Sequence, residues 1–255
     1  MNFVISASTD VGIKKTTNQD SLTIQTIKTR QGRMVFALIC DGMGGLSKGE
    51  LASATLVDAF QQWVRQELPS LCQTPIADAV IQSQWENIIY QQNQKIGDYG
   101  KHHGIRLGTT VVAMLITEQR YYILNVGDSR AYELTDTIRQ LTTDQTYVAR
   151  EVAAGRMTPE QAKTDRYRNV LLQCCGSSEQ IYPEMICGAT KLNAVYMLCS
   201  DGFRHEISAE EIYQSLQPSV LLSHETMQRN TDALIELNKR RMERDNISVT
   251  LVRTF

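Results

Sequence analysis

The stretch ALICDGMGG, residues 37–45, ends an apolar run abruptly with an aspartate and a group of glycines. Asp-Gly is a common turn dipeptide, so the simplest interpretation of Asp41 is a turn after a buried strand. A similar stretch, YMLCSDGF, occupies residues 196–203 and places Asp201 after another apolar run. The repetition raises the hypothesis that Asp41 and Asp201 belong to one site.

Length and composition indicate a globular protein. The chain has 255 residues, of which 42% are hydrophobic, so it can bury a sizeable core. No linker-like, low-complexity or repeated segment interrupts it, and we predict one domain over residues 1–255. The net charge of −2 excludes the electrostatic footprint of a nucleic-acid-binding protein. The basic run at residues 239–244 is typical of a helix C-terminus, with a phosphate or partner contact as the alternative.

The chain also lacks the sequence features of a secreted or membrane protein. Polar residues occur throughout residues 1–15, unlike in a signal peptide, and the apolar runs at 34–40 and 111–116 are too short to cross a bilayer. The six cysteines show no CxxC spacing and mostly lie in apolar stretches. We therefore expect reduced, buried cysteines in a cytoplasmic protein that does not bind membranes.

Short β-type segments alternate with amphipathic helices along the chain. A short turn at 118–119 indicates an antiparallel hairpin, and residues 127–129 are interpreted as a second hairpin turn. Ser47 and Glu50 form a capping-box pattern before the first helix. We predict an α+β fold with sheets packed under helices. The predicted strands cover 3–7, 22–27, 34–40, 109–116, 120–126, 131–134, 195–199 and 247–253, and the predicted helices cover 51–68, about 74–94, a pair within 143–164, 208–216 and 223–241.

Several aspartates stand at the ends of these predicted strands. Each one alone is compatible with an ordinary turn. Converging strand ends would gather the carboxylates into a small volume, where their repulsion is costly unless a cation compensates it. The aspartates are Asp20 and Asp245 before strands, Asp41 and Asp201 after strands, and Asp128 in the second predicted hairpin turn.

Such a cluster favours particular metals and a particular reaction. Hard oxygen ligands without nearby His or Cys select Mg²⁺ or Mn²⁺ rather than zinc. The glycine that follows Asp41 lets the backbone approach closely, so the carbonyl of Gly42 could also be a ligand. Two such ions can activate a water and stabilise an in-line displacement at phosphorus. The residues therefore indicate phosphoryl hydrolysis.

Seven short segments of the chain resemble, in their residues and in their order, the motif set of the PPM family, the metal-dependent type 2C protein phosphatases. The resemblance extends over about residues 8–252, with spacings similar to those of compact bacterial members. It implies a central β-sandwich of two antiparallel sheets flanked by pairs of helices. It also implies hydrolysis of phosphoserine and phosphothreonine in proteins by a metal-bridging hydroxide. The segments are NQD (18–20), CDGMGG (40–45), GTT (108–110), NVGDSRAY (125–132), LTTDQ (141–145), CSDGF (199–203) and RDNIS (244–248).

The resemblance implies a role for each matching aspartate. Asp41 would bridge two Mg²⁺ or Mn²⁺ ions, and the carbonyl of Gly42 would bind one of them. Asp201 and Asp245 would complete the ligands of the other ion. Asp20 would act mainly through a bound water.

Further positions would support these ligands. Asp128 would help to hold a third, weaker metal. Ser200 and Asn246 would stand behind the metal ligands, and residues 108–110 would pack behind the site. The resemblance implies phosphorylated proteins as partners, produced by a serine/threonine kinase, and a chain that acts as a monomer.

The chain departs from the family pattern at two places. Lys15 stands where an arginine usually grips the substrate phosphate, and lysine supplies the charge without the bidentate fork. The alternative is that Lys15 is a solvated loop residue. In the flap, a subregion at about residues 143–175, the usual His-Pro is replaced by Asp165-Arg166. Cys174 and Cys175 also replace small residues there, and we expect them to be buried rather than redox-active.

Three functions are compatible with these observations. The motif set favours an active phosphoprotein phosphatase. A pseudophosphatase that only binds phosphoproteins would be marked by a missing ligand aspartate, and none of the expected aspartates is missing. A hydrolase of another phosphate monoester stays open because of Lys15 and the altered flap.

Overall fold

The computed structural model describes residues 1–43 and 48–255, and its strands form two antiparallel five-stranded sheets. We call them the first and the second sheet. The first has the order β1 (Phe3–Asp10), β10 (Ile247–Thr254), β9 (Val195–Cys199), β6 (Arg130–Leu134) and β7 (Ile138–Gln140). The second has the order β2 (Ser21–Thr29), β3 (Gly32–Cys40), β4 (Val111–Ile116), β5 (Arg120–Val126) and β8 (Glu184–Ala189).

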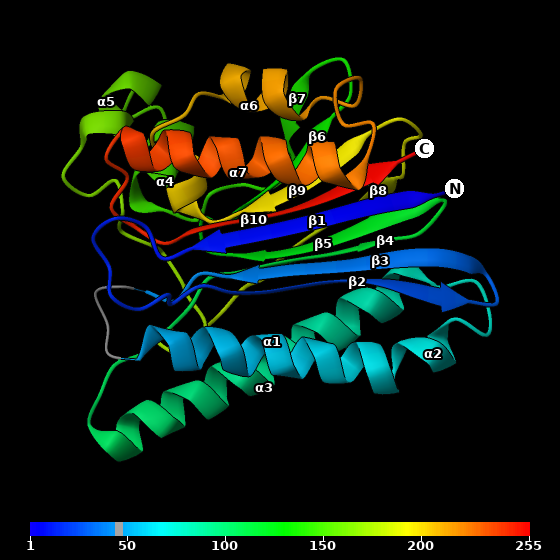
Figure 1. Ribbon diagram of the computed structural model, residues 1–255. Helices are drawn as coiled ribbons and strands as arrows, with labels where there is room; N and C mark the ends of the chain where they lie inside the picture. The colour runs from blue at the N-terminus through cyan, green and yellow to red at the C-terminus, as the bar shows by residue number, and fades with distance from the viewer. Residues whose placement is uncertain (44–47) are drawn as a thin grey trace.

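The two sheets lie face to face, and helices cover both outer faces (Figure 1). The second sheet is covered by α1 (Gly49–Gln66) and α3 (Asp78–His103), which the short α2 (Leu68–Leu71) separates. The first sheet is covered by α6 (Ala209–Leu216) and α7 (His224–Arg240). The short helices α4 (Tyr147–Ala153) and α5 (Pro159–Thr164) lie at the left-hand end in Figure 1. This four-layer arrangement confirms the predicted β-sandwich flanked by helices.

Strand β3 shows how the sequence produces these layers. Alternate residues of a strand point to opposite faces, so a strand buried on both sides is apolar throughout. Phe36 and Leu38 belong to the core under α1 and α3, whereas Ala37 and Ile39 belong to the core between the sheets. Phe36 lies 6.0 Å from the ring of Trp85 in α3, edge to face. The run that ends at Asp41 is therefore a strand in the middle of the sandwich.

The segment 127–129 is not a hairpin turn, and the prediction for this segment was wrong. Strand β5 pairs with β4 and β8, whereas β6 pairs with β7 and β9, so the chain crosses here from the second sheet to the first. Gly127 has φ +104°, a conformation that side chains other than hydrogen rarely allow. A Cβ atom at this position would lie 2.7 Å from Cγ2 of Thr110. The sequence Gly-Asp-Ser is compatible both with a hairpin turn and with a connection between the two sheets, so the sequence alone did not distinguish them.

Substituting Gly127 by alanine is expected to destabilise the protein by about 1–3 kcal/mol, because backbone strain and the contact with Thr110 add together. Urea unfolding measures the loss. The matched control is Gly155→Ala, since Gly155 also has positive φ but a Cβ there would meet no atom within 4 Å. Equal losses in both variants would show that the contact with Thr110 costs nothing.

The helices differ from the prediction in their boundaries and buried faces. Helix α3 begins at Asp78, after position 74, and continues past residue 94 to His103. On α1 the buried positions include Ala52 and Leu56, whereas Leu51 is 37% exposed. Of the apolar residues that recur every three or four positions, Val57, Phe60 and Val64 are buried, whereas Leu51 and Ala54 are exposed. Strands β7 and β8 were not predicted.

The predicted cap of α1 falls on Ser47, which lies outside the described residues. The N-cap position is Lys48, with φ 57°, and its side chain makes no capping hydrogen bond. Glu50 instead accepts a hydrogen bond from the side chain of Gln19 at 3.3 Å. This contact ties the first turn of α1 to the loop before β2.

Two further expectations concern the chain as a whole. No helix within residues 1–43 and 48–255 is both long and apolar enough to cross a membrane. All six cysteines carry free thiols and are buried, except for Cys187. The expected burial of Cys174 and Cys175 is confirmed.

Candidate functional site

The aspartates singled out in the sequence lie at one end of the sandwich. In the second sheet, Ser21 is paired with Cys40, so Asp20 and Asp41 leave their strands at the same end. In the first sheet, Cys199 is aligned with Val249 and Arg130, which brings the segments of Asp201, Asp245 and Asp128 to that end as well. The sheets are joined there by a hydrogen bond of 2.6 Å from the hydroxyl of Ser248 to Oδ2 of Asp20.

These carboxylates are close enough to disturb each other's ionisation. Burial raises the pKa of Asp20 to about 7, assisted by the charges of Asp201 and Asp245 and opposed by hydrogen bonds from Ser248 and Ser200. Part of Asp41 reaches solvent, but the packing around its carboxyl raises its pKa well above the usual range. The neighbouring carboxylates raise it further. Such crowding is stable at neutral pH when cations are present.

Two carboxylate oxygens show that the residues fit a bound cation. Oδ1 of Asp20 and Oδ1 of Asp201 are buried, and neither has a hydrogen-bond partner among the described residues. Buried acceptors are normally satisfied, so these atoms point to a missing positive partner. As the side chains stand, no three His, Cys, Asp or Glu residues in the described parts of the chain close around a single point. Protein cations instead contact two members of the group: Lys15 contacts Asp245, and Arg204 contacts Asp128.

The backbone of Asp41 and Gly42 is fixed by the segment 108–110. The carbonyl of Asp41 accepts hydrogen bonds from the hydroxyl of Thr109 and the N–H of Thr110, both 2.9 Å long. The N–H of Asp41 donates to the hydroxyl of Thr110 at 3.1 Å. At Gly42 a Cβ atom would lie 2.4 Å from the carbonyl oxygen of Gln19. Only glycine fits this crossing of two loops, so the position of Asp41 is rigidly defined.

Asn246 and Ser200 hold the surrounding loops in place. Oδ1 of Asn246 accepts the N–H of Gln19 at 2.9 Å, and its Nδ2 donates to the carbonyl of Val11 at 2.9 Å. The hydroxyl of Ser200 accepts the N–H of Ser248 at 3.0 Å. Asn246 therefore fastens the loop that carries Lys15 to the start of β10.

Lys15 itself lies within the cluster. Its Nζ is 3.0 Å from Oδ1 of Asp245, and the side chain is partly exposed. A loop lysine directed away from the site would not make this contact. The ammonium group is thus positioned where an anionic ligand of the cluster could reach it.

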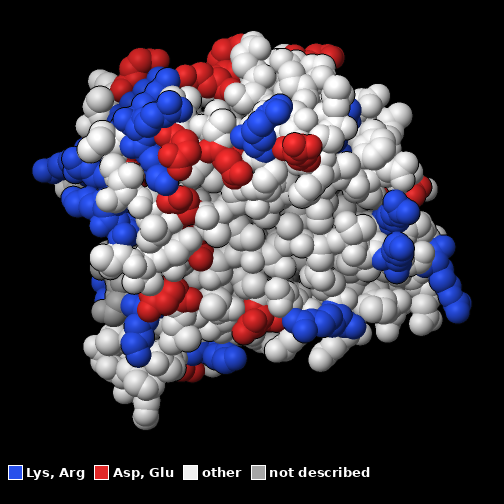
Figure 2. All heavy atoms as spheres, in the orientation of Figure 1, with Lys and Arg blue, Asp and Glu red and all other residues white. Residues whose placement is uncertain are grey.

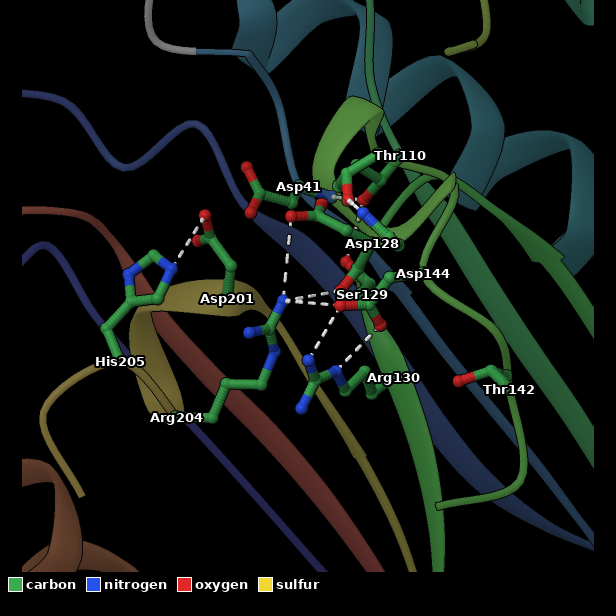
Figure 3. A network of polar contacts seen from close by, with 12 residues as sticks. Asp41, Thr110, Asp128, Ser129, Arg130, Thr142, Asp144, Asp201, Arg204 and His205 are labelled. Atoms are coloured by element: carbon green, nitrogen blue, oxygen red, sulfur yellow. Dashed lines mark hydrogen bonds and ion pairs between the residues drawn. The ribbon is translucent and has the colours of Figure 1, made fainter. Parts of the chain in front are cut away.

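Two arginines that were not predicted to belong to the site, Arg130 and Arg204, lie beside Asp128 (Figure 3). Nη2 of Arg204 donates to the carbonyl of Asp128 at 2.9 Å and lies 3.5 Å from its Oδ2. Burial raises the pKa of Asp128 to about 6, while the charge of Arg204 opposes the increase. Arg130 holds Asp144 through two hydrogen bonds of 2.7 and 2.6 Å, and Arg204 lies 3.8 Å from the same carboxylate. Asp144 and Arg130 occur inside two quoted motifs, but Arg204 directly follows CSDGF, outside the motif.

His205 was also overlooked. Its Nε2 lies 3.5 Å from Asp201, and its Nδ1 lies 3.3 Å from Glu243. Burial alone would lower the pKa of His205, but the hydrogen bond with Glu243 and the charge of Asp201 raise it. Glu243 also accepts the N–H groups of Arg244 and Asp245, at 2.6 and 2.8 Å. His205 precedes α6 and Glu243 follows α7, so the two residues are far apart in the sequence and no motif contains both.

The predicted flap lies beside the cluster and is attached to the crossing segment. Helices α4 and α5 form the helical pair expected within 143–164. Gln145 accepts the N–H of Gly127 at 2.7 Å through its side chain and accepts the N–H of Leu172 at 2.8 Å through its carbonyl. A movement of the flap would therefore be transmitted to the segment of Asp128.

Comparisons with known proteins agree with this geometry. The family model described as protein phosphatase 2C matches residues 12–239. A putative protein phosphatase 2C-type protein of Streptococcus pyogenes is 31% identical over 251 residues, which cover 97% of this chain and 96% of that protein. The protein phosphatase PhpP of Streptococcus pneumoniae is 29% identical, with the same coverage.

Solved structures give the same result. The serine/threonine phosphatase of S. agalactiae superimposes with a TM-score of 0.81 and 27% identity over the whole of both chains. The catalytic domain of the serine/threonine phosphatase PstP, solved with two manganese ions, superimposes with a TM-score of 0.78 and 26% identity, covering 98% of this chain and 97% of that one. The fold and the acidic site thus define a phosphatase of the β-sandwich type. The chain belongs to the protein phosphatase 2C family.

Proposed function

We propose that this chain is a metal-dependent protein phosphatase that hydrolyses phosphoserine and phosphothreonine side chains of proteins. Family membership and the serine/threonine phosphatases among its relatives support the reaction class. The observation that carries the proposal is the pair of buried carboxylate oxygens, on Asp20 and Asp201, without a partner among the described residues. Two unsatisfied anionic atoms from different sheets favour a cation between them over a structural hydrogen-bond network.

We assign the metal ligands to the residues of the acidic cluster. Asp41 and the carbonyl of Gly42 would hold one ion, and Asp41 with Asp201 and Asp245 the other. Asp20 would contribute mainly through a water. When bound, such a pair of ions supplies a water of lowered pKa and positive charge beside the phosphoryl oxygens. The all-oxygen ligand set suits Mg²⁺ and Mn²⁺ equally well, and Mn²⁺ is the ion in the PstP structure.

The protein itself contributes position and charge to the reaction. The hydrogen bonds from Thr109 and Thr110 fix the backbone of Asp41, so its carboxylate need not reorganise during turnover. Asn246 and Ser200 fix the loops on the other side of the cluster. Lys15 would pair with a phosphate oxygen of the substrate in exchange for Asp245.

A third, weaker metal at Asp128 is part of the proposal. The contact with Arg204 already supplies a positive charge to this carboxylate. An ion at Asp128 must therefore compete with a guanidinium group, which accounts for a lower affinity than at Asp41.

Figure 2 shows basic side chains gathered at the left-hand end of the molecule. The basic run at 239–244 ends α7, and Lys239 and Arg241 pair with Asp10 and Glu211. These contacts support a helix-terminal role for the run over a phosphate or partner patch.

The decisive test uses three kinds of substrate. Hydrolysis of p-nitrophenyl phosphate with Mn²⁺, and none with EDTA, distinguishes an enzyme from a phosphoprotein-binding pseudophosphatase. Phosphothreonine and phosphoserine peptides should then be hydrolysed more efficiently than small phosphate monoesters such as glycerol phosphate. The proposal fails if the chain hydrolyses neither aryl phosphate nor phosphopeptides, or if it prefers the small monoester.

Lys15→Ala is expected to raise KM for a phosphopeptide by roughly tenfold and to change kcat less, because one charge-assisted contact with the phosphate is lost. Steady-state kinetics on one phosphothreonine peptide measures both constants. Lys15→Arg is the matched control and should restore or improve KM, since its fork binds phosphate in bidentate fashion. An unchanged KM in the alanine variant would make Lys15 a solvated loop residue.

A further inference from the structure

A hollow of 640 Å³ lies at the end of the sandwich opposite the acidic cluster. Strands β9 and β10 connect the two ends: Cys199 and Ile247 lie beside the acidic cluster, whereas Asn193 and Arg253 lie at the hollow. The other walls are the β6–β7 turn and the α6–α7 connection at residues 217–222. The chain termini mark this end on the right-hand side of Figure 1.

Arg253 is a charged residue on an otherwise apolar face of β10. In β10, Ile247, Val249 and Leu251 belong to the apolar core under α6 and α7. Because side chains alternate along a strand, position 253 faces the same layer. Arg253 therefore places a charged group next to a row of apolar side chains, and it is only 9% exposed.

This buried charge lacks an acidic counterpart. No carboxylate forms an ion pair with Arg253 among the described residues. Its Nη1 donates to the carbonyl of Thr254 and its Nη2 to Oδ1 of Asn193 at 3.4 Å, while Nε is buried with no partner in the described part of the chain. Burial without a compensating anion lowers the pKa of Arg253. An uncompensated buried guanidinium is costly, and stability alone gives no reason to keep it.

Two other charged side chains line the hollow, those of Lys191 and of Asp136, an exposed residue of the β6–β7 turn. Lys191, which also lines the hollow, pairs with Glu133 at 2.8 Å. Glu133 is further shared with Arg139 at 2.9 Å. The hollow therefore presents the guanidinium of Arg253, whose charge no carboxylate of the described residues pairs, together with the neutralised Lys191 and the exposed carboxylate of Asp136.

Part of the rim of the hollow is apolar, between polar side chains such as Thr135 and Gln217. Leu222 is 81% exposed and Leu192 is 60% exposed, and both line the hollow together with Pro218. Exposed leucines on either side of a buried cation are the features of a site for a ligand with an anionic head and an apolar body.

We propose that this hollow binds an organic carboxylate with an apolar body of a few carbon atoms. The carboxylate pairs with the guanidinium of Arg253, whose planar fork matches its geometry. The carbon chain lies against Leu192 and Leu222. The hollow is remote from the acidic cluster, so the inference does not depend on the proposed phosphatase reaction.

Hexanoate is a suitable probe, with hexanamide as the neutral control and hexyl phosphate as the phosphate control. Saturation-transfer NMR and thermal shift are measured on the full chain. Hexanoate is expected to bind with a Kd on the order of millimolar. Hexanamide should bind at least about tenfold more weakly, because it cannot neutralise the guanidinium.

Three variants locate the probe. Arg253→Met should lower hexanoate affinity at least about tenfold while the melting temperature stays the same or rises, because an uncompensated buried charge is removed. Arg65→Met, at an exposed arginine of α1 outside the hollow, is the matched control and should bind hexanoate normally. Leu222→Ser should weaken the binding of hexanoate but not that of acetate, because acetate has no carbon chain to contact Leu222.

The proposal is overturned if wild-type chain binds hexanamide as well as hexanoate, or if Arg253→Met retains hexanoate binding. Tighter binding of hexyl phosphate than of hexanoate, lost in Arg253→Met, would also overturn the assignment to carboxylates. A fall in melting temperature in Arg253→Met, with no hexanoate binding to the wild type, would give Arg253 a purely structural role. If the methionine variant does not fold, Arg253→Gln replaces it in the same comparison.

Discussion

Replacing Asp41 or Asp201 by asparagine is expected to lower kcat toward p-nitrophenyl phosphate by about a thousandfold or more. Each substitution removes a charged ligand from the centre of the acidic cluster, and even supporting residues of metal sites typically contribute 10- to 100-fold. The assay is run with saturating Mn²⁺. Asp136→Asn is the matched control, because Asp136 is an exposed turn aspartate at the opposite end of the sandwich.

The loss of activity in these variants should not come from unfolding. The carboxyl of Asp41 is crowded by Asp20, Asp201, Asp128 and Asp245, which raise its pKa. Without metal, an asparagine at position 41 therefore removes repulsion and should leave the melting temperature equal or higher. Substantial activity in either variant would show that Asp41 and Asp201 do not share one site. A large fall in the melting temperature in EDTA would show that the carboxylate has a structural role instead.

Addition of Mn²⁺ to the metal-free chain is expected to raise its melting temperature by roughly 5–10 °C. An ion at 100 times its Kd stabilises the native state by about 2.7 kcal/mol, and each kcal/mol corresponds to about 2–4 °C in a chain of this size. The physical cause is the neutralisation of carboxylates whose oxygens have no partner among the described residues. Differential scanning calorimetry measures the shift, and EDTA should reverse it.

The same experiment ranks the ligands. Asp41→Asn should lose most of the shift, and Asp128→Asn should lose little, because Asp128 already contacts Arg204. A shift of equal size in wild type and Asp41→Asn would place the stabilising ion elsewhere.

Much of the site was predictable because strand ends are visible in the sequence. A short apolar run such as residues 34–40 is typical of a strand buried on both faces, which places Asp41 at the end of a strand. The same holds for Asp201 after β9. Family resemblance added the order of the motifs and the sandwich, and the sheet topology confirmed that fold.

What could not be predicted depends on contacts between distant segments. The connection at 127–129 has the composition of a hairpin turn, and only the pairing of β6 with β9 shows that it crosses between sheets. Arg204 and His205 look like ordinary residues after a turn, since their partners Asp128 and Glu243 are far away in the chain. Arg253 stands near the end of an otherwise regular strand, and only the fold shows that it is buried beside the α6–α7 connection.

The buried face at the start of α1 and the end of α3 were also not predicted from the sequence. Apolar residues occur on two adjacent stripes of α1, so periodicity alone did not distinguish Ala52 and Leu56 from Leu51 and Ala54. In α3 the polar residues near position 94 resemble the end of a helix, yet Asn93 bonds the loop at Ser178 and the helix continues. Tertiary contacts, rather than propensity, determined both outcomes.

We propose that carboxylates from both sheets form a single metal site around Asp41. Isothermal titration of the metal-free chain with Mn²⁺ tests it most directly, in parallel with Asp41→Asn and Asp136→Asn. We expect at least two Mn²⁺ ions per chain in the wild type and in Asp136→Asn, and a loss of the tight binding in Asp41→Asn. The account is contradicted if the wild type binds no Mn²⁺, or if Asp41→Asn binds the same number of ions with the same affinity.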